Sequence, residues 1–327
     1  MKGLAILMVV AGHYLFIPYL REAIWSFHMP LFVFLNGWFY KQGPFPARVR
    51  KSAKAYLKPY AIVWAILVAA ACVCALVSDP ASLGTAFKGR IASGVYALAS
   101  DLTLHRPESI TKIGAIWFLI ALFWANVFMN LVFRIRRFWL QALAVVAVLL
   151  TAMMLTARFC IPLGLHYGAA FLPWIWLGAR YSGAKDRGSR IVAFLESPGG
   201  FIACLLGWIG IVVLEGWTGN SFNICWLRYP LCVLELAGAF FGIVCIQAVS
   251  KWLEKALPRI SGALRYLGCA TLWILCVHAI DIELLGKLFP DSLWGQALRG
   301  CFDIAVALVL RLAFKRLSQK KAFADQV

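Results

Sequence analysis

The chain has 327 residues, of which 62% are hydrophobic and only 14% are charged, and its formal net charge at neutral pH is +18. Soluble domains average roughly half apolar and a quarter charged residues, so this composition excludes an ordinary soluble protein. Several apolar stretches reach the about 18 residues that are needed to cross a bilayer. The chain is therefore predicted to be a multi-pass integral membrane protein.

The predicted fold is all-α, with one transmembrane domain over residues 1–327 and about ten membrane-spanning helices. Their bounds follow from the apolar runs, which are separated by polar or basic connections. The predicted spans are residues 3–20, 28–41, 60–78, 116–133, 138–157, 167–183, 199–217, 226–248, 266–285 and 296–314.

The first two predicted spans differ from ordinary membrane helices. Residues 3–20 begin like a signal peptide, but no obvious small-residue cleavage site precedes His13, so we expect a retained helix. Residues 28–41 form a short segment that contains Pro30 and Gly37. Such interrupted elements occur at membrane depth only where they are buried in protein or line a cavity. The second segment is therefore expected to face an internal cavity.

The positive charge of the chain follows its topology. With both termini in the cytoplasm, every inner connection is basic, as the positive-inside rule requires. This pattern argues against a nucleic-acid partner and favours an inner or plasma membrane location. The 23 of 32 Lys and Arg residues assigned to the inner side are Lys2, Lys41, Arg48, Arg50, Lys51, Lys54, Lys58, Arg134, Arg136, Arg137, Arg180, Lys185, Arg187, Arg190, Lys251, Lys255, Arg259, Arg265, Arg311, Lys315, Arg316, Lys320 and Lys321.

The longest predicted connection, residues 78–115, lies on the outer side. Connections longer than about 15 residues without structure of their own are uncommon and often functional. A helix on the outer surface is expected within it, over residues 86–104. His105, and His166 further along the chain, are predicted to be exterior and solvated.

Two histidines near the start of the chain are the first candidates for chemistry. His13 lies within the first apolar segment and His28 opens the second, and ionisable residues at membrane depth are rare and usually functional. Lys2 precedes His13 by 11 residues, which puts them within about 20° of one helix face and about 16 Å apart along the axis. Lys2 alone could be an anchor and His13 alone a satisfied buried histidine. Together with His28 they favour a functional site.

A third histidine, His278, lies in the ninth predicted span. Thr271 precedes it by seven residues and Asp281 follows it by three, so all three share one helix face. A carboxylate beside an imidazole fixes its tautomer and raises its basicity, so Asp281 is expected to orient His278. Alternatively, Thr271 bonds within its own helix and Asp281 only marks the outer membrane edge.

Other polar residues in the spans have two open interpretations. Glu235 and Asp303 are lone carboxylates in apolar helices, and each needs a partner; Arg299, four residues before Asp303, is a local candidate. Arg180 could bind a phosphate at the inner face or simply anchor its helix. The chain shows no spacing typical of a metal site, no glycine-rich nucleotide loop and no GxSxG or HExxH motif.

Five stretches of the chain carry a resemblance to a known family: Lys2–His13, Ser26–Gly37, Trp117–Leu119, Phe171–Gly178 and Gly268–His278. Together they resemble the acyltransferase 3 membrane family, particularly its fucose 4-O-acetylase-like branch. The topology of that family also has ten helices with both ends inside. The chain departs from the family pattern at Asn36, where Ser is usual, at Lys2, where Arg is common, and at Met1, which leaves no room for a short acidic-containing stretch.

The resemblance implies transfer of an acyl group, most often acetyl, from cytoplasmic acyl-CoA to a hydroxyl of a cell-surface or lipid-linked carbohydrate. No metal is implied, and the acceptor glycan and the oligomeric state stay open. The resemblance suggests CoA phosphate binding for Lys2 and Arg180, and the role of general base for His13. It suggests oxyanion or substrate contacts for His28, Thr271 and Trp117. His278, with Asp281, would deliver the proton.

Two alternatives to acetyl transfer are considered. Succinyl transfer to a glucan would use the same cavity with another acyl-CoA. A proton-coupled transporter or flippase could relay protons through His13, His278, Glu235 and Asp303. Transporters often carry broken helices at corresponding positions of two halves, and here the broken element has no visible counterpart.

Overall fold

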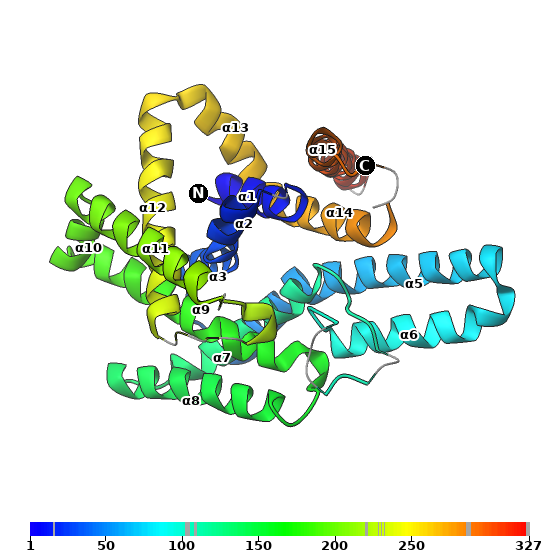
Figure 1. Cartoon of the computed structure of the whole chain (residues 1–327), viewed down its shortest axis with the longest axis horizontal. Helices are drawn as coiled ribbons and strands as arrows, with labels where there is room; N and C mark the ends of the chain where they lie inside the picture. Colours follow the sequence, from blue (N-terminus) through cyan, green and yellow to red (C-terminus); the bar gives the residue numbers. More distant parts are fainter. Residues whose placement is uncertain are drawn as a thin grey trace. The chain divides into compact units, whose positions relative to one another are not determined.

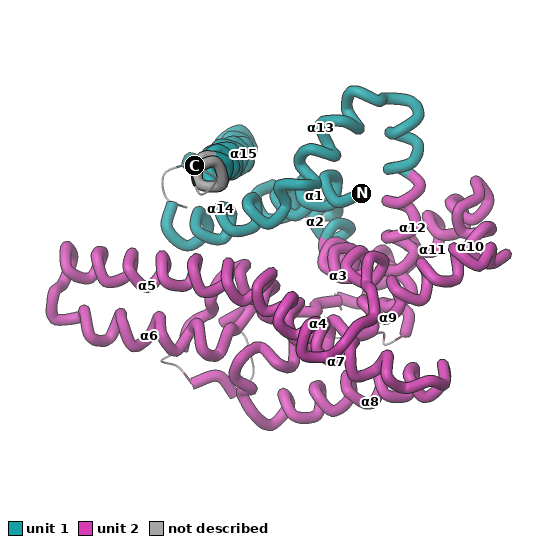
Figure 2. The backbone as a smooth tube through the Cα atoms, turned by 180° about the vertical axis from the view of Figure 1, so that it is seen from behind, with its two compact units in different colours: residues 1–24, 249–327 teal, residues 25–248 magenta. Residues whose placement is uncertain are grey.

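The computed structural model describes residues 1–15, 17–101, 105–107, 110–219, 222–227, 229, 231, 233–285 and 289–324. Within these ranges the chain is helical and contains no β-strand. It divides into two compact units, residues 1–24 with 249–327 and residues 25–248 (Figure 2). The single domain over residues 1–327 stays a prediction.

The first unit joins the two ends of the chain. Within it, α14 packs along α15, and α1 contacts α13, α14 and α15. Segments that are more than 230 residues apart in sequence therefore form one core. Its helices are α1 (Lys2–Tyr14), most of α2 (Pro18–Trp25), the end of α12 (Val233–Ala256), α13 (Pro258–Gly268), α14 (Thr271–Leu284) and α15 (Leu293–Ala324).

The first predicted span, residues 3–20, is not one helix. α1 ends at Tyr14, and Leu15 is extended, with φ −89° and ψ 106°. In a continuous helix, the Pro18 ring would clash with the carbonyl of Tyr14, and its missing N–H would leave that carbonyl without its partner. A proline fits the first turn of a new helix, and α2 begins at Pro18. His13 and Tyr14 therefore occupy the last turn of α1.

The second unit has its core where α9 packs against α3, α7 and α8. α5 and α6 lie side by side as a helical pair (Figure 1). The elements are α3 (His28–Trp38), α4 (Phe45–Ser52), η1 (Ala53–Leu57), α5 (Lys58–Ser78), η2 (Pro80–Ser82), α6 (Leu83–Tyr96), α7 (Trp117–Val132), α8 (Phe138–Thr156), η3 (Pro162–Gly164), α9 (Leu165–Asp186), α10 (Arg190–Leu195), α11 (Pro198–Thr218), η4 (Ile224–Trp226) and most of α12.

Two glycines bring α3 and α9 into backbone contact. A Cβ at Gly37 would lie 1.9 Å from the carbonyl oxygen of Ile175, and one at Gly178 would lie 2.0 Å from that of Phe34. Neither position can carry a side chain without separating the helices. The glycines that end two of the matching stretches therefore serve one helix crossing.

Each of the ten predicted spans overlaps at least one helix, but fewer helices are long and apolar enough to cross a membrane. Four helical stretches of the described chain are long and apolar enough to cross a membrane: Phe45–Ser78, α8, α11 and α12. A fifth results if α13 and α14, which meet at 66°, form one bent span. The ten-span topology with both termini cytoplasmic stays a prediction.

The outer helix expected over residues 86–104 is α6, which starts earlier, at Leu83, and ends at Tyr96. Ala97 ends it in the left-handed conformation, with φ 54°. The helix packs on α5, where Tyr60 Oη donates to Gly94 O at 2.6 Å and Trp64 Nε1 donates to Arg90 O at 2.9 Å. The end of the expected range, residues 102–104, lies outside the described residues.

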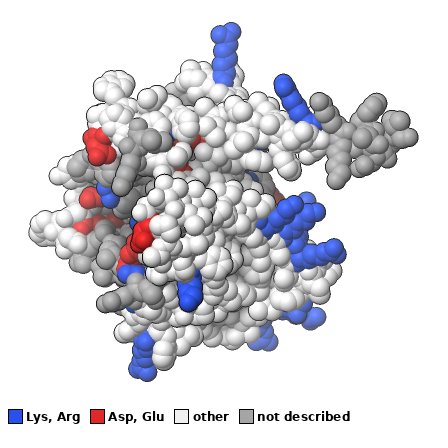
Figure 3. Space-filling view, turned by 90° about the vertical axis from the view of Figure 1, so that its right-hand side faces the viewer, with Lys and Arg blue, Asp and Glu red and all other residues white. Residues whose placement is uncertain are grey.

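Figure 3 shows a face that is largely uncharged, because most of it belongs to residues other than Lys, Arg, Asp and Glu. Large apolar side chains on α5, α8 and α11 are exposed, among them Val73, Leu143 and Leu206. Such a surface suits lipid contact and agrees with a membrane protein.

Candidate active site

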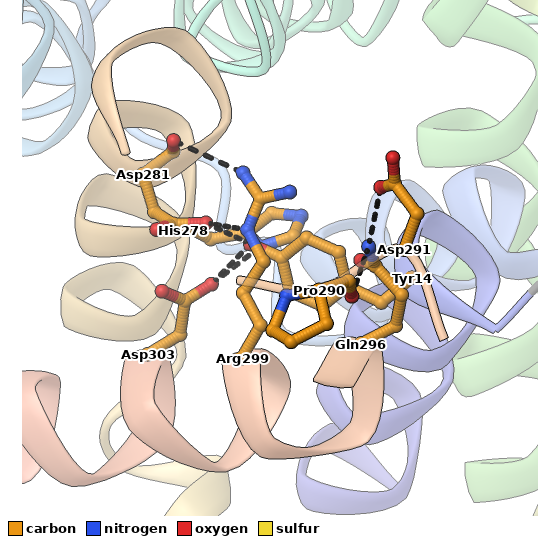
Figure 4. Close-up of polar contacts among 8 residues, drawn as sticks. All are labelled: Tyr14, His278, Asp281, Pro290, Asp291, Gln296, Arg299 and Asp303. Carbon is orange, nitrogen blue, oxygen red and sulfur yellow. Dashed lines mark hydrogen bonds and ion pairs between the residues drawn. The ribbon is translucent and has the colours of Figure 1, made fainter. Parts of the chain in front are cut away.

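A buried polar cluster lies where α1, α14 and α15 meet in the first unit (Figure 4). Four of its residues are no more than 3% exposed, and the fifth, Arg299, is 8% exposed. Buried charges need partners, because transferring an unpaired ion from water is very costly. The members of the cluster are Tyr14, His278, Asp281, Arg299 and Asp303.

Tyr14 lies at the centre of the cluster. Its Oη is 2.5 Å from Asp281 Oδ2 and 2.7 Å from Asp303 Oδ2. The hydroxyl therefore links a carboxylate on α14 to one on α15. Because Tyr14 is in the last turn of α1, the break before Pro18 is part of what positions it.

His278 is paired with Asp303 and not with Asp281. His278 Nδ1 lies 2.8 Å from Asp303 Oδ2, so the prediction that Asp281 orients His278 is wrong. Side chains on a helix lean toward its N-terminus, so the imidazole extends away from Asp281, which lies one turn later. A carboxylate from the neighbouring helix α15 reaches the ring instead.

Asp281 is paired with Arg299. Arg299 Nε lies 2.5 Å from Asp281 Oδ2, and its Nη2 donates to Asp281 O at 3.1 Å. The guanidinium also lies over the Tyr14 ring, 4.6 Å from the centroid. Arg299, the local candidate partner of Asp303, thus reaches across to α14 and pairs with Asp281 instead.

His13 lies at the edge of this cluster. Its side chain is exposed, and its ring centroid is 5.2 Å from that of buried His278. Consecutive helical residues point about 100° apart, which explains why Tyr14 is buried while His13 is accessible. The structure thus brings together three predicted site residues, His13, His278 and Asp281.

The arrangement is suited to proton transfer. With Nδ1 bonded to a carboxylate, the tautomer of His278 is fixed. His278 Nε2 has no hydrogen-bond partner among the described residues. An accessible imidazole next to an oriented one can take a proton from a substrate and pass it on. In the described chain, no group of three or more His, Cys, Asp or Glu could hold a metal ion.

Lys2 and Thr271 lie at other positions of the same unit. Lys2 is the first residue of α1, about 16 Å along the axis from His13. Thr271 opens α14, and its hydroxyl donates to Gly268 O at 3.4 Å. Gly268 is the last residue of α13, so the Thr271 hydroxyl bonds to the preceding helix and not, as the alternative expected, within its own helix. The seven residues to His278 correspond to about 10 Å along the helix.

His28 and Trp117 belong to the second unit. His28 is the first residue of α3 and is buried. Trp117 begins α7, and its ring centroid is 4.7 Å from that of Tyr167 and 5.6 Å from that of Phe171. Asn36, the residue that departs from the family pattern, donates to the hydroxyl of Tyr56 on η1. These side chains belong to the packed interior between α3, α7 and α9.

Arg180 is held by other side chains of the second unit. It donates to Gln141 Oε1, which also accepts from Trp176 Nε1 at 3.1 Å. Its guanidinium lies 5.1 Å from the ring centroid of Phe133, 5.3 Å from that of Phe138 and 5.8 Å from that of Trp176. Arginine stacks well on aromatic faces, so these contacts fit the anchoring interpretation. Its buried Nε has no hydrogen-bond partner among the described residues.

Three further polar residues differ in their surroundings. Glu235 is 1% exposed, and its carboxylate lies near the Leu231 backbone without meeting hydrogen-bond geometry. His166 was expected to be solvated, but it is buried, without a hydrogen-bond partner among the described residues, and burial lowers its pKa to about 4. His105 is exposed, and its Nε2 lies 2.8 Å from Ala157 O.

Tyr14 is the member of the cluster that sequence reasoning missed. A tyrosine directly after a candidate catalytic histidine is a weak signal, because tyrosines are also frequent at membrane interfaces. A stronger signal is that a buried Tyr hydroxyl usually has a hydrogen-bond partner. The last spans contain carboxylates without assigned partners, which could accept from it. That pairing requires α1 to pack between the last two helices, which sequence spacing alone does not show.

Comparison with known proteins identifies the family. A family model for an acyltransferase domain matches residues 1–314, nearly the whole chain. No curated protein and no solved structure matches the chain. The matched range includes every member of the buried cluster, all of the second unit and the first unit up to residue 314. The chain therefore belongs to the acyltransferase 3 family and is a membrane acyltransferase.

Proposed function

We propose that this protein transfers an acetyl group from cytoplasmic acetyl-CoA to a hydroxyl of a cell-surface or lipid-linked carbohydrate. The observation that carries this proposal is the accessible His13 imidazole, 5.2 Å from a His278 ring that is bonded to Asp303, within an acyltransferase family member. Acyl transfer to a hydroxyl requires a base to activate the hydroxyl and an acid to protonate the leaving thiolate. Adjacent imidazoles can supply both functions.

The proposed reaction proceeds by direct attack. His13 accepts the proton of the acceptor hydroxyl while the hydroxyl oxygen bonds to the thioester carbonyl carbon. The carbon–sulfur bond then breaks, and the proton passes to the CoA thiolate, which leaves as the free thiol. His278, held by Asp303, stabilises the positive charge that develops on the histidine pair. General acid–base catalysis of this kind contributes about 10²–10⁴-fold to a rate.

The donor would approach along α1. Lys2 at the start of this helix is a suitable contact for a CoA phosphate, and the acyl end would reach His13 about 16 Å further along the helix. Arg180 is a weaker candidate, because Gln141 and three aromatic rings already surround its guanidinium. His28, Thr271 and Trp117 remain proposed contacts for substrate or oxyanion.

The test is release of free CoA thiol by the purified protein supplied with acetyl-CoA, with and without candidate glycans. We expect glycan-dependent release, and a loss of about 10²–10⁴-fold in His13→Ala. His105→Ala is the matched control, because His105 is also exposed but lies outside the cluster, and it should retain full activity. Full activity of His13→Ala would refute the assignment.

Two additional measurements distinguish the alternatives. Succinyl-CoA in place of acetyl-CoA tests the other acyl donor at the same site. Proton flux in vesicles, driven by substrate and independent of CoA, would instead support a transporter that uses the same histidines.

A further inference from the structure

The buried cluster forms a continuous chain of five polar atoms. These are His278 Nδ1, Asp303 Oδ2, Tyr14 Oη, Asp281 Oδ2 and Arg299 Nε, with successive separations of 2.8, 2.7, 2.5 and 2.5 Å. All four separations are hydrogen-bond distances, and each bond requires its own proton. The atoms thus make four contacts that need four protons.

The side chains in their ordinary states supply at most three of them. Arg299 Nε carries one proton, Tyr14 Oη one, and His278 Nδ1 one if that nitrogen is protonated. Ionised carboxylates only accept. With both Asp281 and Asp303 ionised, the single Tyr14 proton can serve only one of them. The other contact would place two oxygen lone pairs against each other.

The net charge of the cluster also calls for one additional proton. Arg299 contributes one positive charge and the two ionised carboxylates two negative charges, while neutral His278 adds none. The groups that face the chain of atoms are Tyr14 and His13 on α1, His278 and Asp281 on α14, and Arg299 and Asp303 on α15; Asp291, just before α15, contacts Gln296 instead. A buried unit negative charge is unfavourable, and one additional proton removes it.

The additional proton belongs between Tyr14 and Asp303. Arg299 lies directly against Asp281 Oδ2, and an adjacent positive charge favours the ionised carboxylate. Asp281 is therefore the acceptor of the Tyr14 proton. The contact of 2.7 Å between Tyr14 Oη and Asp303 Oδ2 is then the one that lacks a proton.

We propose that Tyr14 is a positioning residue that bridges Asp281 and Asp303, and that the network holds one extra proton in the Tyr14–Asp303 contact at neutral pH. The existence of this proton is independent of the proposed function. Its effect on acyl transfer rests on that function, because it keeps the surroundings of His278 neutral while His13 and His278 exchange protons with substrate.

Infrared spectroscopy tests the extra proton without any assay of activity. A protonated carboxyl has a C=O stretching band that is well separated from the bands of an ionised carboxylate. At neutral pH, the wild-type minus Asp303→Asn difference spectrum should show loss of a protonated-carboxyl band. Loss of an ionised-carboxylate band instead would overturn the proposal.

A second measurement covers the case in which Asp303→Asn does not fold. Wild-type protein labelled with ¹³C in the aspartate side-chain carboxyl should show an isotope shift of a protonated-carboxyl band, which separates it from Glu235. If no protonated-carboxyl band shifts with the aspartate label, the proposal is wrong, whatever substrate the enzyme uses.

The pH dependence of acyl transfer tests the role of Tyr14. Its hydroxyl completes two contacts when the extra proton is present and one when it is absent, so it favours the protonated network. Tyr14→Phe should therefore move the alkaline limb of the pH–rate profile to lower pH by about one unit, the equivalent of one hydrogen bond. Tyr60→Phe, which also removes a buried hydroxyl, is the control and should leave the profile unchanged. A purely structural role of Tyr14 would lower the rate equally at every pH.

Discussion

The Arg299–Asp281 pair allows the contribution of the buried cluster to stability to be measured. We predict that Arg299→Met lowers the free energy of unfolding by about 3–5 kcal/mol, the loss expected when one partner of a buried ion pair is removed. The structure supports a value in this range, because the side chains are only 10% and 1% exposed and their closest atoms are 2.5 Å apart. The variant also loses the bond to Asp281 O and the stacking on Tyr14.

The same unit contains a matched control. Arg265 and Glu254 form an ion pair at 2.8 Å, but their side chains are 72% and 61% exposed. Surface pairs contribute about 0–1 kcal/mol, so Arg265→Met should lose no more than that. The two pairs have the same chemistry and similar distances, so the difference between them measures the effect of burial.

The measurement is reversible unfolding of the detergent-solubilised protein, with a double-mutant cycle for each pair. In Arg299→Met with Asp281→Asn, no uncompensated charge is left on Asp281, so much of the loss should be recovered. Equal losses for Arg299→Met and Arg265→Met, or no recovery in the double variant, would refute the reasoning.

Two further predictions concern packing and pH. In Gly300→Ala the new Cβ would lie 2.9 Å from Val10 Cγ1, so the free energy of unfolding should fall by about 1–3 kcal/mol. In the control Gly262→Ala nothing described lies within 4 Å of the new Cβ, so the free energy of unfolding should rise by up to about 1 kcal/mol. His166 is neutral in the folded protein down to its pKa of about 4, while the unfolded chain binds its proton near pH 6.5. Its contribution to stability is therefore complete above about pH 6.5 and lost, by about 3 kcal/mol, as the pH falls toward 4. This loss of stability at acid pH should disappear in His166→Phe and persist in His105→Phe. Equal acid sensitivity of the two variants would contradict the role of His166.

The positions of the helices could be predicted from the sequence because each apolar run is bounded by a strong local signal. α8 spans Phe138–Thr156 where residues 138–157 were expected, and α7 spans Trp117–Val132 where residues 116–133 were expected. The interruption at Pro18 was not predicted, although an interior proline breaks or kinks a helix. The apolar run continues through Pro18, and a hydropathy profile does not show backbone geometry.

The pairing of the buried charges could not be predicted in the same way. Spacing along one helix suggested Asp281 for His278 and Arg299 for Asp303, and both pairings are exchanged in the structure. Periodicity shows which residues share a face. It does not show which neighbouring helix that face meets. The partners of Asp281 and Asp303 depend on how α14 packs against α15 and on the Tyr14 hydroxyl, which lies between the two carboxylates.

The early end of α1 has a consequence for the depth and the electrostatics of the site. α1 has 13 residues and is therefore about 20 Å long. The hydrocarbon core of a bilayer is about 30 Å thick, so α1 is shorter than the core. In the predicted topology, which puts Lys2 at the inner surface, the last carbonyls of α1 would lie within the bilayer. The C-terminal end of a helix carries partial negative charge, which stabilises a nearby cation by about 0.3–1 kcal/mol or more where water is scarce. In the proposed reaction, the break between α1 and α2 would therefore set how far into the membrane the acyl donor must reach, and the end of α1 would direct a negative field at the point where an imidazolium forms.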